Sequence, residues 1–292
     1  MWGEFMSAWP LFGETYAGAV LLAALLGLTG VHVYARRQVF LGAALAQTSA
    51  LGVTLALTTA AWHPFGLHLH HTAWYPRVWA IACAVAAAIG MECASRRNER
   101  RESLSGAVFL FASAAALLIT ANQPFGLEEV QRLLSSSLLV IGGAEVALYG
   151  ALLAAAAIAT VWGCDRMLLT ALDSAAASAA GLRVVGWQRG TALAAAVIIG
   201  ASIQSSGLLF TFANLLLPVL AATRLAREMR TLFMLAPALA ALTTLLGLLL
   251  AHAGDYPPAQ VTVLLQTAVL VIAWGASALA LRFRQCATSC RR

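Results

Sequence analysis

The sequence predicts an all-α polytopic membrane protein, and three observations lead to this prediction. The chain of 292 residues is 61% hydrophobic and only 10% charged, whereas soluble domains carry about 25% charged residues. Its apolar runs have the length of about 17–25 residues that an α-helix needs to cross a bilayer. The alternating segments of about ten residues that are typical of a membrane β-barrel do not occur. A single transmembrane domain over 1–292 follows.

We expect eight or nine transmembrane helices. The sixth and seventh apolar runs are short and are interrupted by QSSG at 204–207, so they form either two spans or a hairpin of broken helices. The expected spans lie near 16–35, 39–61, 74–94, 104–121, 144–163, 190–206, 207–223, 232–252 and 259–281.

The positive charges indicate how the helices are oriented. The chain has no lysine, and its 18 arginines gather mainly in clusters between apolar runs. Such clusters mark cytoplasmic loops, and no basic face extends beyond them, so nucleic acid is not an expected partner. The C-terminus is then inside, and an odd helix count places the N-terminus outside. Three loops face the exterior on this topology: 63–76, 122–130 and 251–260.

Several kinds of chemistry are excluded by missing motifs. A P-loop needs a lysine to hold the nucleotide phosphates, so this chain has no ATPase site of that kind and is not expected to be an enzyme or to bind a cofactor. The ionisable residues His32, Glu92 and Glu145 lie close to predicted helix ends, where snorkelling towards water explains them. The classes of protein that remain possible are a channel, a transporter subunit and an intramembrane scaffold.

Two stripes of small and polar residues run along predicted helices. The first consists of Ala43, Gln47, Ala50, Thr54 and Thr58, at steps of three or four residues. It either packs closely against a neighbouring helix, with the amide bonded across the contact, or lines an uncharged pathway.

The second stripe contains Thr211, Asn214 and Pro218. The proline frees a backbone carbonyl about one turn earlier, which either lines a pathway or meets a neighbouring helix. Asn214 is a candidate partner for Gln47, because pairing the two amides satisfies both.

A longer intracellular segment covers about 166–189. Its SAAASAA stretch favours a short helix, and Gly181 suits a left-handed C-terminal cap. The helix is either a plain surface helix or a docking element for a cytoplasmic partner.

Five segments in order resemble the permease subunits of the ABC-3 family, the membrane components of bacterial zinc, manganese and iron ABC importers. They are RRQVFLGAALAQTSALGV, LLSSSLLVIGGAEVAL, LDSAAASAAGL, GLLFTFANLLLPVLAATRLAR and GDYPPAQVTVLL. The fourth keeps the family spacing between Gly207 and Pro218. The resemblance spans most of the chain.

This resemblance implies a type II importer-like permease in the bacterial inner membrane. It also implies a second permease copy as a homodimer or pseudo-dimer, two cytoplasmic ATPases that use ATP, and an extracytoplasmic solute-binding protein. The segment at 172–182 would then dock on the ATPase. Its expected coupling residues are Asp173, Ser174, Ser178 and Gly181.

The chain departs from the family at two positions. Family members usually have Asp where this sequence has Ala43 and His where it has Gln47. A carboxylate and an imidazole suit Mn²⁺ or Zn²⁺, and both are missing. A divalent transition metal, zinc or manganese, is still the leading substrate that the resemblance implies. The alternative substrate is a metal chelate or another small solute. A third hypothesis is that the protein is a channel or scaffold that works without an ATPase.

A cluster of histidines is the other candidate metal site. His63, His68, His70 and His71 lie in one external loop, and imidazole is the commonest protein ligand for transition metals. Three interpretations are open: the histidines are simply exposed polar residues, they form an external gate site, or they form a docking surface for the binding protein. His252 and Asp255, in the last external loop, complete a metal site if the loops meet.

Overall fold

The computed structural model describes residues 2–62, 74–94, 101–121 and 141–289. All elements in these ranges are helices, and eight of them are long and apolar enough to cross a membrane. The helices are α1 (Trp2–Ala35), α2 (Val39–Trp62), α4 (Trp74–Ala94), α5 (Arg101–Ala121), α7 (Gly143–Leu172), α8 (Ser174–Ala179), α9 (Val184–Leu225), α10 (Met229–Gly254) and α11 (Pro258–Ser289). The all-α membrane fold is confirmed.

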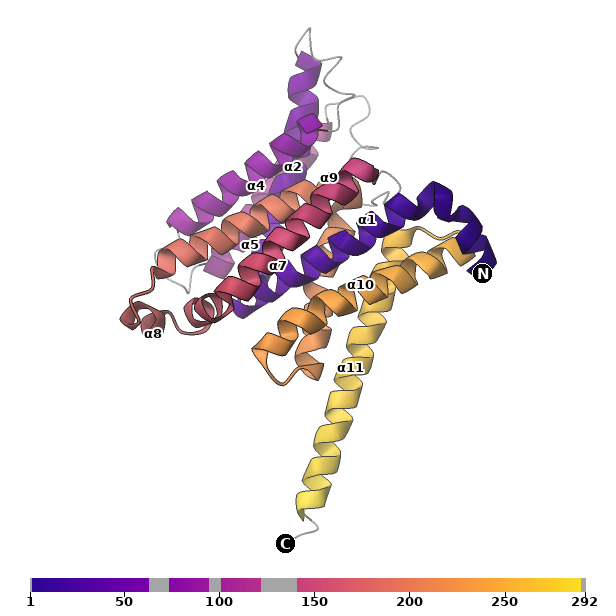
Figure 1. Cartoon of the computed structure of the whole chain (residues 1–292). Helices are drawn as coiled ribbons and strands as arrows, with labels where there is room; N and C mark the ends of the chain where they lie inside the picture. The colour runs from indigo at the N-terminus through magenta and orange to yellow at the C-terminus, as the bar shows by residue number, and fades with distance from the viewer. Residues whose placement is uncertain (1, 63–73, 95–100, 122–140, 290–292) are drawn as a thin grey trace.

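Two helices form the centre of the bundle. Helix α1 lies against α7, α9 and α10, whereas α2 lies against α4, α5 and α9 (Figure 1). Close crossings need glycine: a Cβ on Gly30 of α1 would overlap the backbone carbonyl of Leu215 in α9, and one on Gly52 of α2 would approach the backbone at Trp79. Backbone contact of this kind is how membrane helices gain packing energy without a hydrophobic drive between them.

Helix α9 explains why the sequence allowed either eight or nine spans. It runs for 42 residues, but Gly207 has φ 73° and ψ 173°, which is not helical. The hydroxyl oxygens of Ser202 and Thr211 lie 3.5 Å apart, although nine residues of straight helix rise about 13.5 Å. The chain therefore bends sharply at Gly207 and divides α9 into a first arm, 184–206, and a second arm, 208–225.

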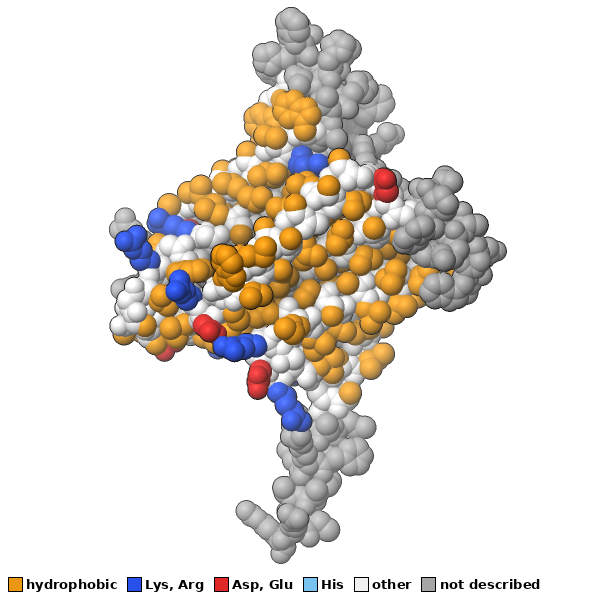
Figure 2. Space-filling view, viewed as in Figure 1, with side chains coloured by type: hydrophobic (Ala, Val, Ile, Leu, Met, Phe, Trp, Pro, Cys, Tyr) orange, Lys and Arg blue, Asp and Glu red, His pale blue; other side chains and the backbone are white. Residues whose placement is uncertain are grey.

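Large apolar side chains cover the outside of the bundle. Phe111, Trp162, Met234 and Leu264 are each more than two thirds exposed, as expected for a surface that faces lipid. Most arginines on the face in Figure 2 follow its lower-left edge, where α8 lies in Figure 1. By the positive-inside rule this arginine-rich end is the one expected to face the cytoplasm.

Candidate functional site

The bend in α9 is surrounded by hydroxyl groups. Thr211 is fully buried, its Oγ1 donates to the Gly207 carbonyl at 2.7 Å, and it lies 2.9 Å from the Ser206 hydroxyl. From α7, the hydroxyl of Tyr149 is hydrogen-bonded to that of Ser205. Buried polar groups in a membrane need such partners. Thr211, an expected pathway residue, therefore belongs to a closed network that supports the bend.

Asn214 has partners that the sequence did not indicate. Its Oδ1 accepts hydrogen bonds from Gln266 Nε2 of α11 at 2.8 Å and from Thr244 Oγ1 of α10 at 3.3 Å, and its Nδ2 donates to the Phe210 carbonyl. Gln266 also donates to Thr243 at 3.3 Å. The second arm is thus joined to α10 and α11 by a buried amide–hydroxyl network.

The expected pair between Asn214 and Gln47 is not formed. No hydrogen bond in the described part of the chain involves Gln47, whose side chain is only partly buried. The reason is geometric, because the Asn214 amide is turned towards α10 and α11. Like Gln47, Gln266 is a lone amide in an apolar run of the sequence. This pattern would have made Gln266 a second candidate partner for Asn214.

The α2 stripe makes only local hydrogen bonds. Thr54 is 1% exposed and donates to the Leu51 carbonyl at 2.8 Å, and Thr58 donates to the Leu55 carbonyl at 2.8 Å. Ala43 and Ala50 are buried. Gln47 is therefore the one long polar side chain of this stripe that is both partly exposed and without a partner among the described residues.

The second stripe ends at Pro218, which is buried inside the second arm. Because proline lacks an N–H, the carbonyl of Asn214 loses its helical partner. Close by, the Leu215 carbonyl is covered by Gly30 of α1. Pro218 thus lies at a tight helix crossing rather than on an open surface.

The predicted external metal site falls only partly within the described residues. His63, His68, His70 and His71 lie outside the described residues. His252 Nδ1 is 3.4 Å from the Tyr16 hydroxyl, and Asp255 caps α10 in a left-handed conformation with φ 52°. No group of three or more His, Cys, Asp or Glu side chains able to hold a metal ion occurs within the described ranges.

Helix α8 forms the expected short element at the arginine-rich end. The backbone N–H groups of Ala175 and Ala176 donate to Asp173 Oδ1 at 3.0 and 2.9 Å, so Asp173 is its N-cap. Gly181 has φ 78°, the left-handed conformation expected after the helix. Ser174 and Ser178 are exposed, and Ser178 donates only to the Ala175 carbonyl. The whole of α8 except Ala177 is accessible to a partner.

The connection around α8 is shorter than the expected segment at about 166–189. Helix α7 continues through Leu172 and α9 begins at Val184, so only 173–183 joins them. The stretch RMLLTAL keeps the apolar period of a helix, and α7 ends only where Asp173 adopts an extended conformation.

A buried ion pair joins the end of α1 to α4. Arg36 and Glu92 are joined at 2.6 Å with side-chain exposures of 7% and 9%. Arg36 also donates to the Gln188 carbonyl at 2.9 Å and to Thr191 Oγ1 at 3.0 Å. The expectation that Glu92 snorkels to water was wrong, because a partner 56 residues away lies beside it. This cluster joins the end of α1, the end of α4 and the start of the first arm of α9 to one another.

Glu145 was misjudged in the same way. Its Oε1 accepts from Arg77 Nη2 at 2.7 Å, and its Oε2 accepts from the Gly142 backbone N–H at 2.6 Å. The third such residue, His32, lies 3.0 Å from Thr160 Oγ1 of α7. Each of these ionisable groups therefore joins two parts of the bundle, and none is a solvated end group.

The family of the chain follows from comparison with known proteins. A model of the ABC 3 transport family matches residues 10–276. The chain belongs to this family. Its fold is similar to a chain of PsaBC from Streptococcus pneumoniae in complex with Fab, with a TM-score of 0.77 and 17% identity over 94% of this chain and 95% of that one.

A second solved structure shares the fold. It is described as an inward-facing conformation of a metal-chelate type ABC transporter, with a TM-score of 0.74 and 14% identity over 93% of this chain and 89% of that one. No curated protein sequence is similar enough to count as a match. At these identities the structural similarity establishes the fold, and the family rests on the match over residues 10–276.

Proposed function

We propose that this protein is the permease subunit of an ABC importer in the bacterial inner membrane. It works with a second copy of itself, a cytoplasmic ATPase dimer and an extracytoplasmic solute-binding protein. The observation that carries the proposal is the family match across 10–276. The exposed helix α8, capped by Asp173 and ended by Gly181, supplies the ATPase-docking element at the arginine-rich end.

The proposed substrate is a divalent transition metal ion, with zinc and manganese as the first candidates. The family resemblance favours them, and the external histidines offer suitable ligands. Gln47 is the pathway residue that we place nearest the substrate, because its amide is partly exposed and has no partner among the described side chains.

A metal chelate is the second candidate substrate. Ala43 and Gln47 supply no anionic ligand, and the other expected pathway residues, Thr54, Thr211 and Asn214, are neutral and already hydrogen-bonded. A cation that keeps its own organic ligands needs no carboxylate from the protein. The similarity in fold to a metal-chelate type ABC transporter agrees with this candidate.

Transport into vesicles tests both candidates. The permease is purified with its partner ATPase, reconstituted with ATP inside, and supplied with its binding protein and radioactive zinc, manganese or a ferric hydroxamate chelate. ATP-dependent uptake of a free ion supports the first candidate, and uptake of only the chelate supports the second. If the complex hydrolyses ATP and takes up none of these probes, the metal proposal is wrong. If no ATPase copurifies, the importer proposal itself fails.

A further inference from the structure

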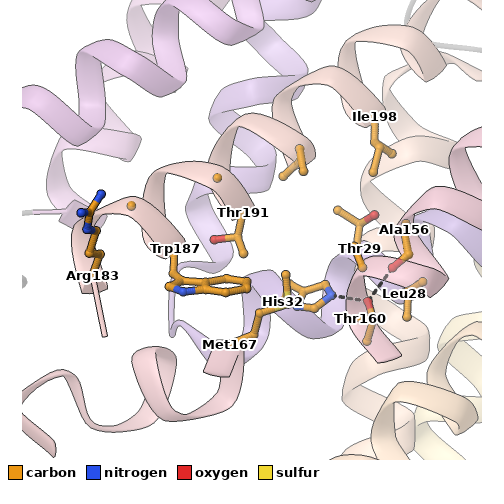
Figure 3. Close-up of a pocket in the computed structure, with 15 residues that line it drawn as sticks. Leu28, Thr29, His32, Ala156, Thr160, Met167, Arg183, Trp187, Thr191 and Ile198 are labelled. Atoms are coloured by element: carbon orange, nitrogen blue, oxygen red, sulfur yellow. Dashed lines mark hydrogen bonds between the residues drawn. The ribbon is translucent and has the colours of Figure 1, made fainter. Parts of the chain in front are cut away.

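The molecule also contains a cavity that is unrelated to the polar stripes. A cavity of about 450 Å³ lies between α1, α7 and the first arm of α9 (Figure 3). Its volume is within the range of about 300–1,000 Å³ that is typical of small-molecule sites. The cytoplasmic end is bounded by Trp187, which packs against Gly163 of α7.

Small residues keep this cavity open towards the outside of the bundle. Gly186, Gly190 and Ala194 follow one another at steps of four along the first arm, and all three are exposed. A Cβ added to Gly190 would meet no atom within 4 Å. On the neighbouring face of α7, Val161 and Trp162 are 77% and 85% exposed. The opening is therefore continuous with a lipid-facing apolar surface.

The polar groups in the cavity wall already have partners. His32 is paired with Thr160, whose hydroxyl donates to the Ala156 carbonyl at 2.7 Å (Figure 3). Thr29 donates to the Leu25 carbonyl at 2.8 Å, and Thr191 accepts from Arg36. The rest of the lining is apolar, apart from Arg183 at the mouth. The wall thus suits an apolar ligand, and apolar cavities retain water poorly.

Among the described residues, Arg183 is the one arginine in the cavity wall. It precedes the first arm, is exposed, and forms no ion pair with another described side chain. It lies at the arginine-rich end of the bundle, which the positive-inside rule assigns to the cytoplasmic side. The cytoplasmic leaflet carries anionic lipid. Arginine binds phosphate through charge-assisted hydrogen bonds.

We propose that this cavity binds one acyl chain of an anionic phospholipid from the cytoplasmic leaflet, with the lipid phosphate on Arg183. An empty crevice of this size would forfeit the dispersion contacts of its lining, and a neighbouring acyl chain restores them. Because the lipid contacts α7 and α9, which flank α8, it also braces the coupling helix. The proposal goes beyond the transport function and does not depend on the substrate.

Photolabelling of the whole complex tests the site. The permease with its ATPase is reconstituted in nanodiscs of phosphatidylethanolamine and phosphatidylglycerol containing a phosphatidylglycerol with a diazirine in its acyl chain. Adducts are mapped by mass spectrometry. We expect them to concentrate on the cavity wall, at Thr191, Ala194 and Ala159, above the level on the exposed apolar residues Leu264 and Val271 of α11. Equal labelling of both surfaces contradicts the site.

Filling the cavity provides the decisive variant. Gly190→Leu should abolish the excess labelling of the wall, and Ala159→Leu, from the opposite wall, should do the same if Gly190→Leu does not fold. Gly90→Leu is the matched control, because Gly90 is also exposed on a helix with no atom within 4 Å of an added Cβ. Unchanged wall labelling in a folded Gly190→Leu protein, or an equal loss in the control, overturns the proposal.

The headgroup is tested separately. The measured quantity is the ratio of cavity-wall labelling by the phosphatidylglycerol probe to labelling by a phosphatidylcholine probe. Arg183→Gln should lower this ratio about fivefold, which corresponds to about 1 kcal/mol per arginine near an anionic surface. An unchanged preference overturns the assignment of the phosphate to Arg183. If the cavity wall of the unmodified complex is labelled no more than the exposed apolar surface, and a second permease copy cross-links across the cavity, the occupant is the partner chain and the lipid assignment is wrong.

Discussion

Helix α2 and the second arm of α9 resemble each other in sequence but differ in what their polar residues do. Each carries a small-residue stripe with one amide, Gln47 or Asn214. Asn214 is fully buried and is bonded to α10 and α11, whereas Gln47 is partly exposed with no described partner. The Asn214 amide therefore holds helices together, and the Gln47 amide remains available to a substrate or to a second copy of the chain.

The largest expected effect is that of Asn214→Leu. The substitution removes the acceptor of the Thr244 hydroxyl and of one N–H of the Gln266 amide, which keeps Thr243 as its other acceptor, and each stranded donor costs about 1–3 kcal/mol. We expect a clear fall in the melting temperature of the purified protein. A melting temperature equal to the wild type would show that this network is not structural.

Gly207→Val should have the next largest effect. The conformation of Gly207, with φ 73° and ψ 173°, costs of order 1–3 kcal/mol for a residue with a side chain. Thermal unfolding in detergent measures the loss. Gly90→Val is the control in a regular helix with open surroundings, and a similar loss there would remove the special role of the bend.

Asp173→Ala tests coupling without touching either stripe. It removes the acceptor for two backbone N–H groups of α8, and loss of an N-cap costs about 1 kcal/mol of helix stability. We expect weaker ATPase copurification and slower uptake at an almost unchanged melting temperature. Asp173→Asn, which preserves a capping oxygen, should retain most of both activities, and failure of this rescue would point to a role for the charge itself.

Gln47→Leu should affect the fold least. No described hydrogen bond is lost, so the change in unfolding free energy should stay within about 0.5 kcal/mol, as for most surface substitutions. Substrate uptake should nevertheless fall in the vesicle assay, because an apolar side chain offers no oxygen to a cation or chelate. Unfolding comparable to Asn214→Leu would mean that Gln47 is structural, and unchanged uptake would remove it from the pathway.

The sequence predicted the helices well because their determinants are local. Apolar length defined the spans, and the ends of α2 and α4 fall within one residue of expectation. Gly181 predicted where the short helix α8 ends, because capping depends on residues within one turn, whereas the role of Asp173 as its N-cap came from the structure. The break near 204–207 was visible too, since a glycine and two serines interrupt the apolar run.

Only the tertiary structure decided which polar group meets which. Asn214 pairs with Gln266 across 52 residues, and Arg36 pairs with Glu92 across 56. Such pairs depend on how each helix is rotated and where it crosses its neighbours, which close contacts such as Gly30 on Leu215 determine. The cavity behind Trp187 arises in the same way, from the spacing of three helices. The sequence by itself therefore determined the membrane helices and the short helix α8, and helix packing determined the roles of their polar residues.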